Sequence, residues 1–186
     1  MNRKETTKFL SDLLIREKLS GNGTGKYWAR EVTLDYGQSE LVEDKYVSKT
    51  RRIDFLQFEP ANQLSVSGIE KGIFICYEIK SCKADFLSGY GKNFVGEKNY
   101  LVMTMSTYRE LKECGEIDKL SHKIGILVPL PRSRKYDETR LKDEYDNPTA
   151  LEECDDWYLE TLRAAHKEYR KRSIVELLFC MVRSGH

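Results

Sequence analysis

The stretch CYEIKSCKADF, residues 76 to 86, places two charged side chains inside an otherwise apolar segment. It continues the apolar run GIFI, and residues 72 to 81 together predict a buried strand. Side chains alternate across a strand, so Glu78 and Lys80 share one face, away from the apolar residues between them. Burying two charges is costly unless they pair with each other or serve a purpose. The remaining sequence has to distinguish these two explanations.

The composition is that of a globular protein whose charges balance. The chain has 186 residues, of which 40% are hydrophobic and 33% charged, enough for one domain with a sizeable core. Its 31 basic and 30 acidic side chains give a net charge of +1, so binding to nucleic acid requires a local basic patch. No apolar run approaches the roughly 20 residues that span a bilayer. The polar N-terminus is no secretory signal, so we expect a cytoplasmic protein without membrane contact.

Apolar periodicity and turn residues outline an α/β domain with a mixed sheet flanked by helices. Residues 41 to 50 are polar and are expected to form a loop. The expected helices cover residues 4–19 and 106–114, and the expected strands cover residues 27–36, 51–60, 72–81, 100–105 and 123–131.

The last third of the chain changes in character. A basic run at residues 132–142 precedes an acidic run at residues 143–156. Helical spacing of apolar residues follows over about 149–170 and again over 172–183. We therefore expect a domain over residues 1–147 and a helical extension over residues 148–186 that packs on it. The first of these helices would present an apolar stripe of Leu151, Trp157, Leu159 and Leu162.

A second acid points to a metal site. Asp54 lies in the middle of the strand RRIDFLQF, and neighbouring antiparallel strands lie about 4.8 Å apart, so Asp54 and Glu78 can meet across a hairpin. Two carboxylates at that distance repel each other unless a cation lies between them, and carboxylates with phosphate oxygens are the ligands of Mg²⁺. Lys80 would orient water or stabilise charge on a phosphate. Glu31, on the preceding strand, is a third candidate acid.

These residues resemble a known pattern. Asp54 followed by Glu78-Ile79-Lys80 is similar to the D…(D/E)-x-K signature of the PD-(D/E)XK nuclease superfamily, and RRID with YEIKSCKADF resembles MmcB-like DNA-repair proteins and small phage or prophage proteins. The resemblance covers roughly residues 10 to 130, although Ile53 replaces the proline of the pattern. It implies a restriction-endonuclease-like core. It also implies that Asp54, Glu78, Glu31 and the carbonyl of Ile79 bind Mg²⁺ or Mn²⁺, with Lys80 as the catalytic lysine.

Structural explanations compete with this interpretation. Glu78 and Lys80 can form an ion pair on an edge strand while Asp54 caps a turn, although the apolar run FICYEIK disfavours an edge position. Asp85, at the start of the next helix, is expected to cap that helix. The glycine-rich stretch GYGKNFVGEK lacks the spacing of a nucleotide-binding loop.

Basic residues outside the motif are candidate contacts to nucleic acid phosphates, and the alternative for each is a solvated surface position. Some flank the motif and others form a cluster near the C-terminus. The candidates are Arg52, Lys92, Lys98, Arg170, Lys171 and Arg172.

Three functions follow from these observations. The first is a metal-dependent nuclease that hydrolyses DNA phosphodiester bonds in repair, recombination or phage DNA metabolism. The second is a nucleic-acid-binding protein of the same fold that does not cleave. The third is a phage-encoded factor that binds a protein partner through its C-terminal helices. The clustered carboxylates favour the first, because a binding protein has no need of them beside DNA.

Overall fold

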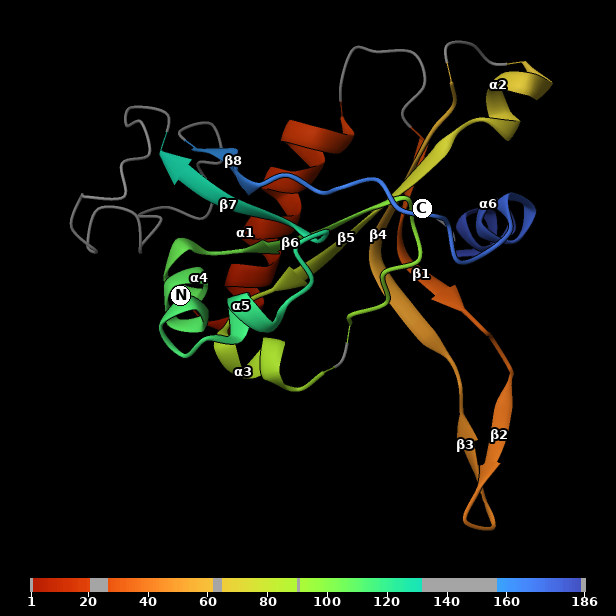
Figure 1. The fold of residues 1–186 in the computed structure, drawn as a ribbon, viewed down its shortest axis with the longest axis horizontal. Helices are drawn as coiled ribbons and strands as arrows, with labels where there is room; N and C mark the ends of the chain where they lie inside the picture. The colour runs from red at the N-terminus through yellow and green to blue at the C-terminus, as the bar shows by residue number, and fades with distance from the viewer. Residues whose placement is uncertain (1, 21–26, 62–64, 90, 132–156, 185–186) are drawn as a thin grey trace.

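The computed structural model describes residues 2–20, 27–61, 65–89, 91–131 and 157–184. Their centre is a six-stranded sheet in the order β1-β4-β5-β6-β7-β8 (Figure 1). Strands β1, β4 and β5 form an antiparallel meander, β6 and β7 run parallel to β5, and β8 is antiparallel to β7. The predicted α/β fold with a mixed central sheet is confirmed. The strands are β1 (Tyr27–Leu34), β4 (Arg51–Glu59), β5 (Ile73–Lys80), β6 (Lys98–Met103), β7 (Gly125–Pro131) and β8 (Trp157–Arg163).

Helix α1 (Arg3–Leu14) covers one face of the sheet and continues as a single π-helical segment, η1 (Ile15–Leu19). Its N-terminus is closed by a capping box, in which Asn2 accepts from the Glu5 amide and Glu5 accepts from the Asn2 amide. Its apolar stripe packs against alternate residues of the sheet strands. The helix predicted over residues 4–19 is therefore confirmed.

The opposite face of the sheet is covered by two groups of helices. Helix α6 (Ile174–Ser184) packs on β1, β4 and the start of β5, while α3 (Lys83–Leu87), α4 (Met105–Glu113) and α5 (Glu116–Lys119) pack on β6 and β7. A short helix, α2 (Val66–Glu70), connects β4 to β5. Two separate apolar clusters result. On this face, the C-terminal half of β5 contributes no residue to either cluster. Glu78 and Lys80 lie there.

The loop predicted over residues 41–50 is wrong. Strands β2 (Ser39–Val42) and β3 (Lys45–Ser48) pair with each other as a hairpin that extends away from the main sheet (Figure 1). Its two-residue turn places Glu43 at φ 46° and Asp44 at φ 61°. Such turns normally use glycine or asparagine, which tolerate positive φ. Their absence hid the hairpin from sequence patterns.

The helix predicted over residues 149–170 is wrong for residues 157–170, because residues 157–163 form β8 and residues 164–170 are not helical. Residues 149–156 lie outside the described part. Strand β8 pairs with β7, and Trp157 and Leu159 alternate into the core. After β8 the backbone stays extended and bonds across the sheet, with Glu168 N donating to Glu97 O at 2.8 Å. Helix α6 confirms the helix predicted over 172–183. The described C-terminal extension is therefore a strand and a helix.

Candidate active site

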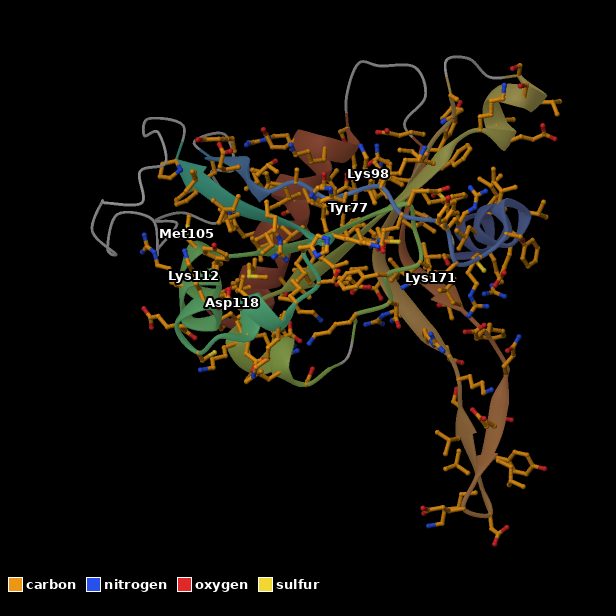
Figure 2. The ribbon with its side chains drawn as sticks, in the orientation of Figure 1. Tyr77, Lys98, Met105, Lys112, Asp118 and Lys171 are labelled. Atoms are coloured by element: carbon orange, nitrogen blue, oxygen red, sulfur yellow. The ribbon has the colours of Figure 1, made fainter. Side chains whose placement is uncertain are left out.

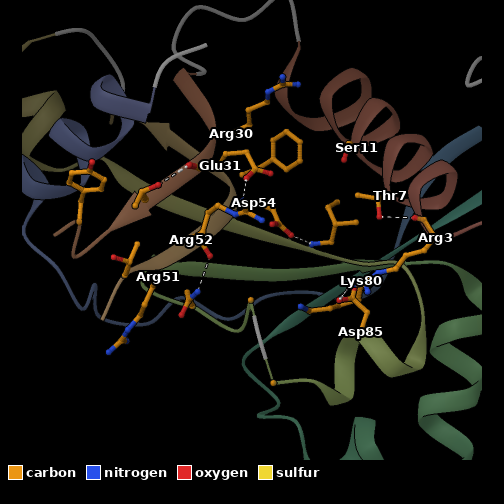
Figure 3. Close-up of a pocket in the computed structure, with 18 residues that line it drawn as sticks. Arg3, Thr7, Ser11, Arg30, Glu31, Arg51, Arg52, Asp54, Lys80 and Asp85 are labelled. Atoms are coloured by element: carbon orange, nitrogen blue, oxygen red, sulfur yellow. Dashed lines mark hydrogen bonds and ion pairs between the residues drawn. The ribbon is translucent and has the colours of Figure 1, made fainter. Parts of the chain in front are cut away.

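The side chain of Asp54 takes the place of a backbone hydrogen-bond acceptor at the point where β4 stops pairing with β5. The ladder between the two strands ends at the pair Phe55 and Tyr77, so Asp54 is the next residue and would stand opposite Glu78. Its side chain instead accepts a hydrogen bond from the backbone N–H of Ile79, at 2.8 Å to Oδ2 (Figure 3). Burial raises the pKa of Asp54, against the opposing effects of this hydrogen bond and of Lys80.

Glu78 is fully buried, and neither carboxylate oxygen has a hydrogen-bond partner within the described part of the chain. Its pKa is raised to about 8, mainly by burial and then by the Asp54 carboxylate, while Lys80 acts in the opposite direction. The Asn93 amide and the Asp54 carboxyl are close enough to influence this pKa, but neither forms a hydrogen bond of acceptable geometry with Glu78. A buried carboxylate without partners is costly, and native proteins keep such groups for a purpose.

Gly91 crosses directly over Glu78 and Lys80. A β-carbon added to Gly91 would lie 2.8 Å from Glu78 Oε2 and 2.9 Å from Lys80 Nζ, so both charged atoms face the same point. The backbone of Gly91 also has φ 64°, which favours glycine. The predicted shared face of Glu78 and Lys80 is confirmed. The surrounding stretch GYGKNFVGEK does not match a nucleotide-binding loop, and no sequence pattern indicated this role of Gly91.

The backbone N–H and C=O groups of Ile79 face the side of β5 on which Asp54 lies. In a strand, the N–H and C=O of one residue point to the same side, and the N–H of Ile79 points towards Asp54. Its carbonyl therefore also faces the edge that β4 has left, and Ile79 lines the cleft described below. This orientation fits the carbonyl ligand that the resemblance implies.

An open cleft of about 1340 Å³ leads to these residues (Figure 3). One wall is α1, which contributes Arg3, Thr7 and Ser11 at four-residue spacing. The opposite wall is formed by β1 and β4, and the segment after α3 closes a third side. Further lining residues are Arg30, Glu31, Tyr36, Arg51, Arg52, Asp54, Lys80, Asp85, Gly89, Gly91 and Asn93.

Glu31 lies beside the site but is engaged elsewhere. Its Oε2 atom is 2.7 Å from Arg52 Nη1, and its backbone has φ 55°, an unusual conformation for glutamate. Its charge reaches Asp54, whose pKa it raises slightly after the larger effect of burial. Within the described ranges no three His, Cys, Asp or Glu side chains are grouped closely enough to hold a metal ion. The structure thus brings Asp54 and Glu78 together and leaves Glu31 at the rim.

Two of the predicted phosphate contacts adjoin the cleft. Arg52 lines it, and the Asn93 side chain donates to the Arg52 carbonyl at 2.8 Å, which ties β4 to the segment that covers the site. Lys92 Nζ lies 3.9 Å from the centre of the Phe86 ring. The pKa of Lys92 is lowered by desolvation and then by Lys80, so these two ammonium groups are near each other.

The remaining predicted contacts lie elsewhere (Lys98 and Lys171 are labelled in Figure 2). Lys98 pairs with Ile75, five residues before Lys80 and about 16 Å from it at the usual rise of a strand. Arg170 is 3.0 Å from the buried Glu97 carboxylate, and Arg172 bonds to Asp35 and Glu176. Lys171 is exposed but stands on the same extended segment. None of these four residues lines the cleft.

Arg3 and Asp85 were not predicted as a pair. Arg3 Nη2 lies 2.6 Å from Asp85 Oδ1, while Asp85 Oδ2 accepts from the amide and hydroxyl of Ser81 at 3.2 Å each. The expectation that Asp85 caps α3 is wrong, because the N-cap is Cys82 and has no side-chain cap. Asp85 lies inside the first turn and instead joins Ser81 to Arg3 at the mouth of the cleft. The four-residue spacing of Arg3, Thr7 and Ser11 on a helix was the available signal.

A divalent ion fits the donor set. The carboxylates of Asp54 and Glu78 approach each other at low solvent exposure, Glu78 has two unsatisfied oxygens, and the Ile79 carbonyl faces the same side. Oxygen donors of this kind suit Mg²⁺ and Mn²⁺. Burial is the main cause of the raised pKa of both Asp54 and Glu78, and the Asp54 carboxylate adds to it at Glu78.

The helices of the described residues include none that is long and apolar enough to cross a membrane. In comparisons with known proteins, the chain matches no family model, no curated protein and no solved structure.

Proposed function

We propose that this protein is a Mg²⁺- or Mn²⁺-dependent nuclease that hydrolyses DNA phosphodiester bonds. The observation that carries the proposal is the buried, unpartnered carboxylate of Glu78, which lies beside Asp54 and Lys80, two residues that line the cleft. A pair held only for stability would satisfy the oxygens of Glu78, because an unpaired buried acid destabilises the fold.

Each residue has a distinct role in this proposal. Asp54, Glu78 and the Ile79 carbonyl would hold the ion, which supplies positive charge to the phosphate and makes water more acidic. Lys80 places its ammonium group beside the same point as Glu78, where negative charge develops on the phosphate in the transition state. Asp54 depends on the Ile79 amide for its orientation.

The walls of the cleft suit a polyanionic substrate. The net charge of +1 gives no general attraction, but Arg3, Arg30, Arg51 and Arg52 all line this cleft. Arginine binds phosphate oxygens through several donors, and neutralising phosphates gives binding that weakens with salt. DNA as the polymer follows from the resemblance to the PD-(D/E)XK superfamily, and DNA repair, recombination and phage DNA metabolism are the settings it suggests.

The test is cleavage by the purified chain. Single-stranded, duplex and branched DNA, labelled at one end, are incubated with Mg²⁺, with Mn²⁺ or with EDTA. We expect products in at least one metal and none in EDTA, with Asp54→Asn and Glu78→Gln inactive. Intact DNA of all three forms in both metals, with a protein that binds Mn²⁺ in calorimetry, would overturn the proposal.

A DNA-binding protein that does not cleave is the second candidate. Lys80 is only 3% exposed and Gly91 covers it together with Glu78, which restricts access of a phosphate to both. Binding of DNA that is insensitive to Asp54→Asn, without cleavage, would favour this function.

A further inference from the structure

Exposed apolar side chains gather on two elements and, apart from Tyr36, lie outside the cleft. Twelve large hydrophobic residues are exposed in the described part of the chain, and eight of them lie on the β2–β3 hairpin with its base or on α6. Scattered single residues would need no explanation, but clusters indicate an interaction surface. The eight residues are Tyr36, Leu41, Val42, Tyr46, Val47, Val175, Phe179 and Val182.

The first cluster is the hairpin arm, residues 36–48. Both four-residue strands are exposed along their whole length, so no other part of the described chain covers them. Leu41 and Tyr46 are directly opposite in the ladder and share one face. The arm ends in the exposed acids Glu43 and Asp44, which occupy positive-φ positions despite the strain.

The second cluster is one face of α6. Val175, Phe179 and Val182 follow helical spacing and are 73%, 62% and 82% exposed, whereas Leu177 and Cys180 on the other side are buried against the sheet. The segment before this helix carries the exposed bases Lys167 and Lys171. Helix α6 thus follows a basic segment and has an exposed apolar face, on which Arg183 lies 5.8 Å from the centre of the Phe179 ring.

We propose that the arm of one copy of this chain packs on α6 of a second copy, and that the reciprocal contact closes a two-fold dimer. The acidic tip of the arm complements Lys167 and Lys171, and the face with Leu41 and Tyr46 complements the apolar face of α6. Four-residue strands extend about 13 Å, and Val175 to Val182 spans about 10 Å, so the two surfaces match in length.

The exposed area is sufficient for such a contact. At roughly 200 Å² for each aromatic side chain, Tyr36, Tyr46 and Phe179 together expose about 400 Å², half of what each partner buries in a standard interface. The five aliphatic residues and the polar ends add to this area. The reciprocal contact satisfies two-fold symmetry, because the arm and the helix of each copy are both used. This inference is independent of the proposed nuclease function.

The first experiment measures mass in solution. Sedimentation velocity of the full chain over a range of concentrations should show a dimer. Tyr46→Asp and Phe179→Asp should each give a monomer that keeps the circular dichroism spectrum of the parent, because both side chains are exposed. Leu87→Asp is the matched control, since Leu87 is 51% exposed but lies on α3, which packs on the other apolar cluster, and this variant should remain a dimer. A monomeric parent, or dimeric variants, would overturn the proposal.

The second experiment tests which surfaces meet. A mixture of Tyr46→Asp and Phe179→Asp retains one intact arm and one intact helix, so it should form a heterodimer with one normal contact. The mixture should therefore show dimer at concentrations where each variant alone is a monomer. If the contact were arm to arm or helix to helix, mixing would restore nothing, and that result would exclude the proposed pairing.

Discussion

The Asp54 carboxylate accepts a hydrogen bond of 2.8 Å from the Ile79 backbone N–H, at the position where β4 stops pairing with β5. One side-chain oxygen thus takes over from the carbonyl that a continuing strand would supply. This replacement opens the edge of β5 beside Glu78 and Lys80. It also means that Asp54 has a structural contact in addition to the proposed ligand role.

Two substitutions of Asp54 distinguish its structural contact from its proposed role as a metal ligand. Asp54→Asn retains an oxygen acceptor for the Ile79 amide and removes a like charge beside Glu78, so its melting temperature in EDTA should equal or exceed that of the parent. Asp54→Ala leaves a partly buried N–H unpaired, which costs about 1–3 kcal/mol and lowers the melting temperature by roughly 2–4 °C per kcal/mol. Both should abolish the stabilisation by Mn²⁺. A parent protein without any Mn²⁺ shift in a thermal melt would argue against the metal site.

Glu78 should make stability depend on pH. Its pKa of about 8 in the folded protein lies above the ordinary value of 4.5, so the folded state holds a proton that the unfolded chain releases. Stability should therefore fall as the pH rises between these two values. Glu78→Gln cannot ionise and should lose this fall, melting higher than the parent above about pH 8. Thermal melts across this range in EDTA check the prediction, and parallel curves for the two proteins would contradict it.

Lys80→Ala should lower the cleavage rate by about 100-fold or more while Mn²⁺ affinity stays close to that of the parent, because the ammonium group acts on the transition state. Lys98→Ala removes the same charge at the other end of the neighbouring strand and should cleave normally. Single-turnover kinetics with metal titration measure both effects. Parental rates in Lys80→Ala would remove that lysine from the mechanism.

Gly91→Ala should disturb the site more than Gly89→Ala. Both glycines have positive φ, so each alanine costs about 1 kcal/mol of backbone strain. An added β-carbon meets Glu78 and Lys80 at Gly91 but nothing within 4 Å at Gly89. We expect the larger drop in melting temperature, and the loss of Mn²⁺ response, only for Gly91→Ala. Equal effects would show that the segment over the site moves away freely.

Salt dependence should separate the basic residues near the cleft from those near the C-terminus. Lys92→Gln should reduce the slope of log affinity for duplex DNA against log salt by about 0.9, the value for one phosphate contact. Lys171→Gln should leave the slope unchanged, because Lys171 stands outside the cleft. Fluorescence anisotropy titrations at several salt concentrations provide the slopes. If Lys171→Gln reduced the slope and Lys92→Gln did not, the basic cluster near the C-terminus would be part of the DNA-binding surface.

The sequence alone determined the elements whose partners are near in the chain or whose pattern is unambiguous. The apolar run of β5 required a buried strand, and its two-residue period placed Glu78 and Lys80 on one face. The spacing of Phe9, Leu10 and Leu13 was sufficient for α1. The candidate trio of Asp54, Glu78 and Lys80 followed from charges within apolar strands, because burial makes such charges expensive.

Only the tertiary structure decided the rest. Residues 157–163 carry apolar residues at both helical spacing (Leu159 and Leu162) and strand spacing (Trp157 and Leu159), and they become β8 because β7, distant in sequence, offers a free edge. The hairpin forms although Glu43 and Asp44 are poor turn residues, because β1 and β4 hold its two ends together. Gly91 lies over the site, and Arg170 and Arg172 turn inward to Glu97 and Asp35, through contacts that no local pattern encodes. Local sequence sets the period of side chains, whereas pairing between distant segments depends on which edges and charges the assembled sheet leaves unsatisfied.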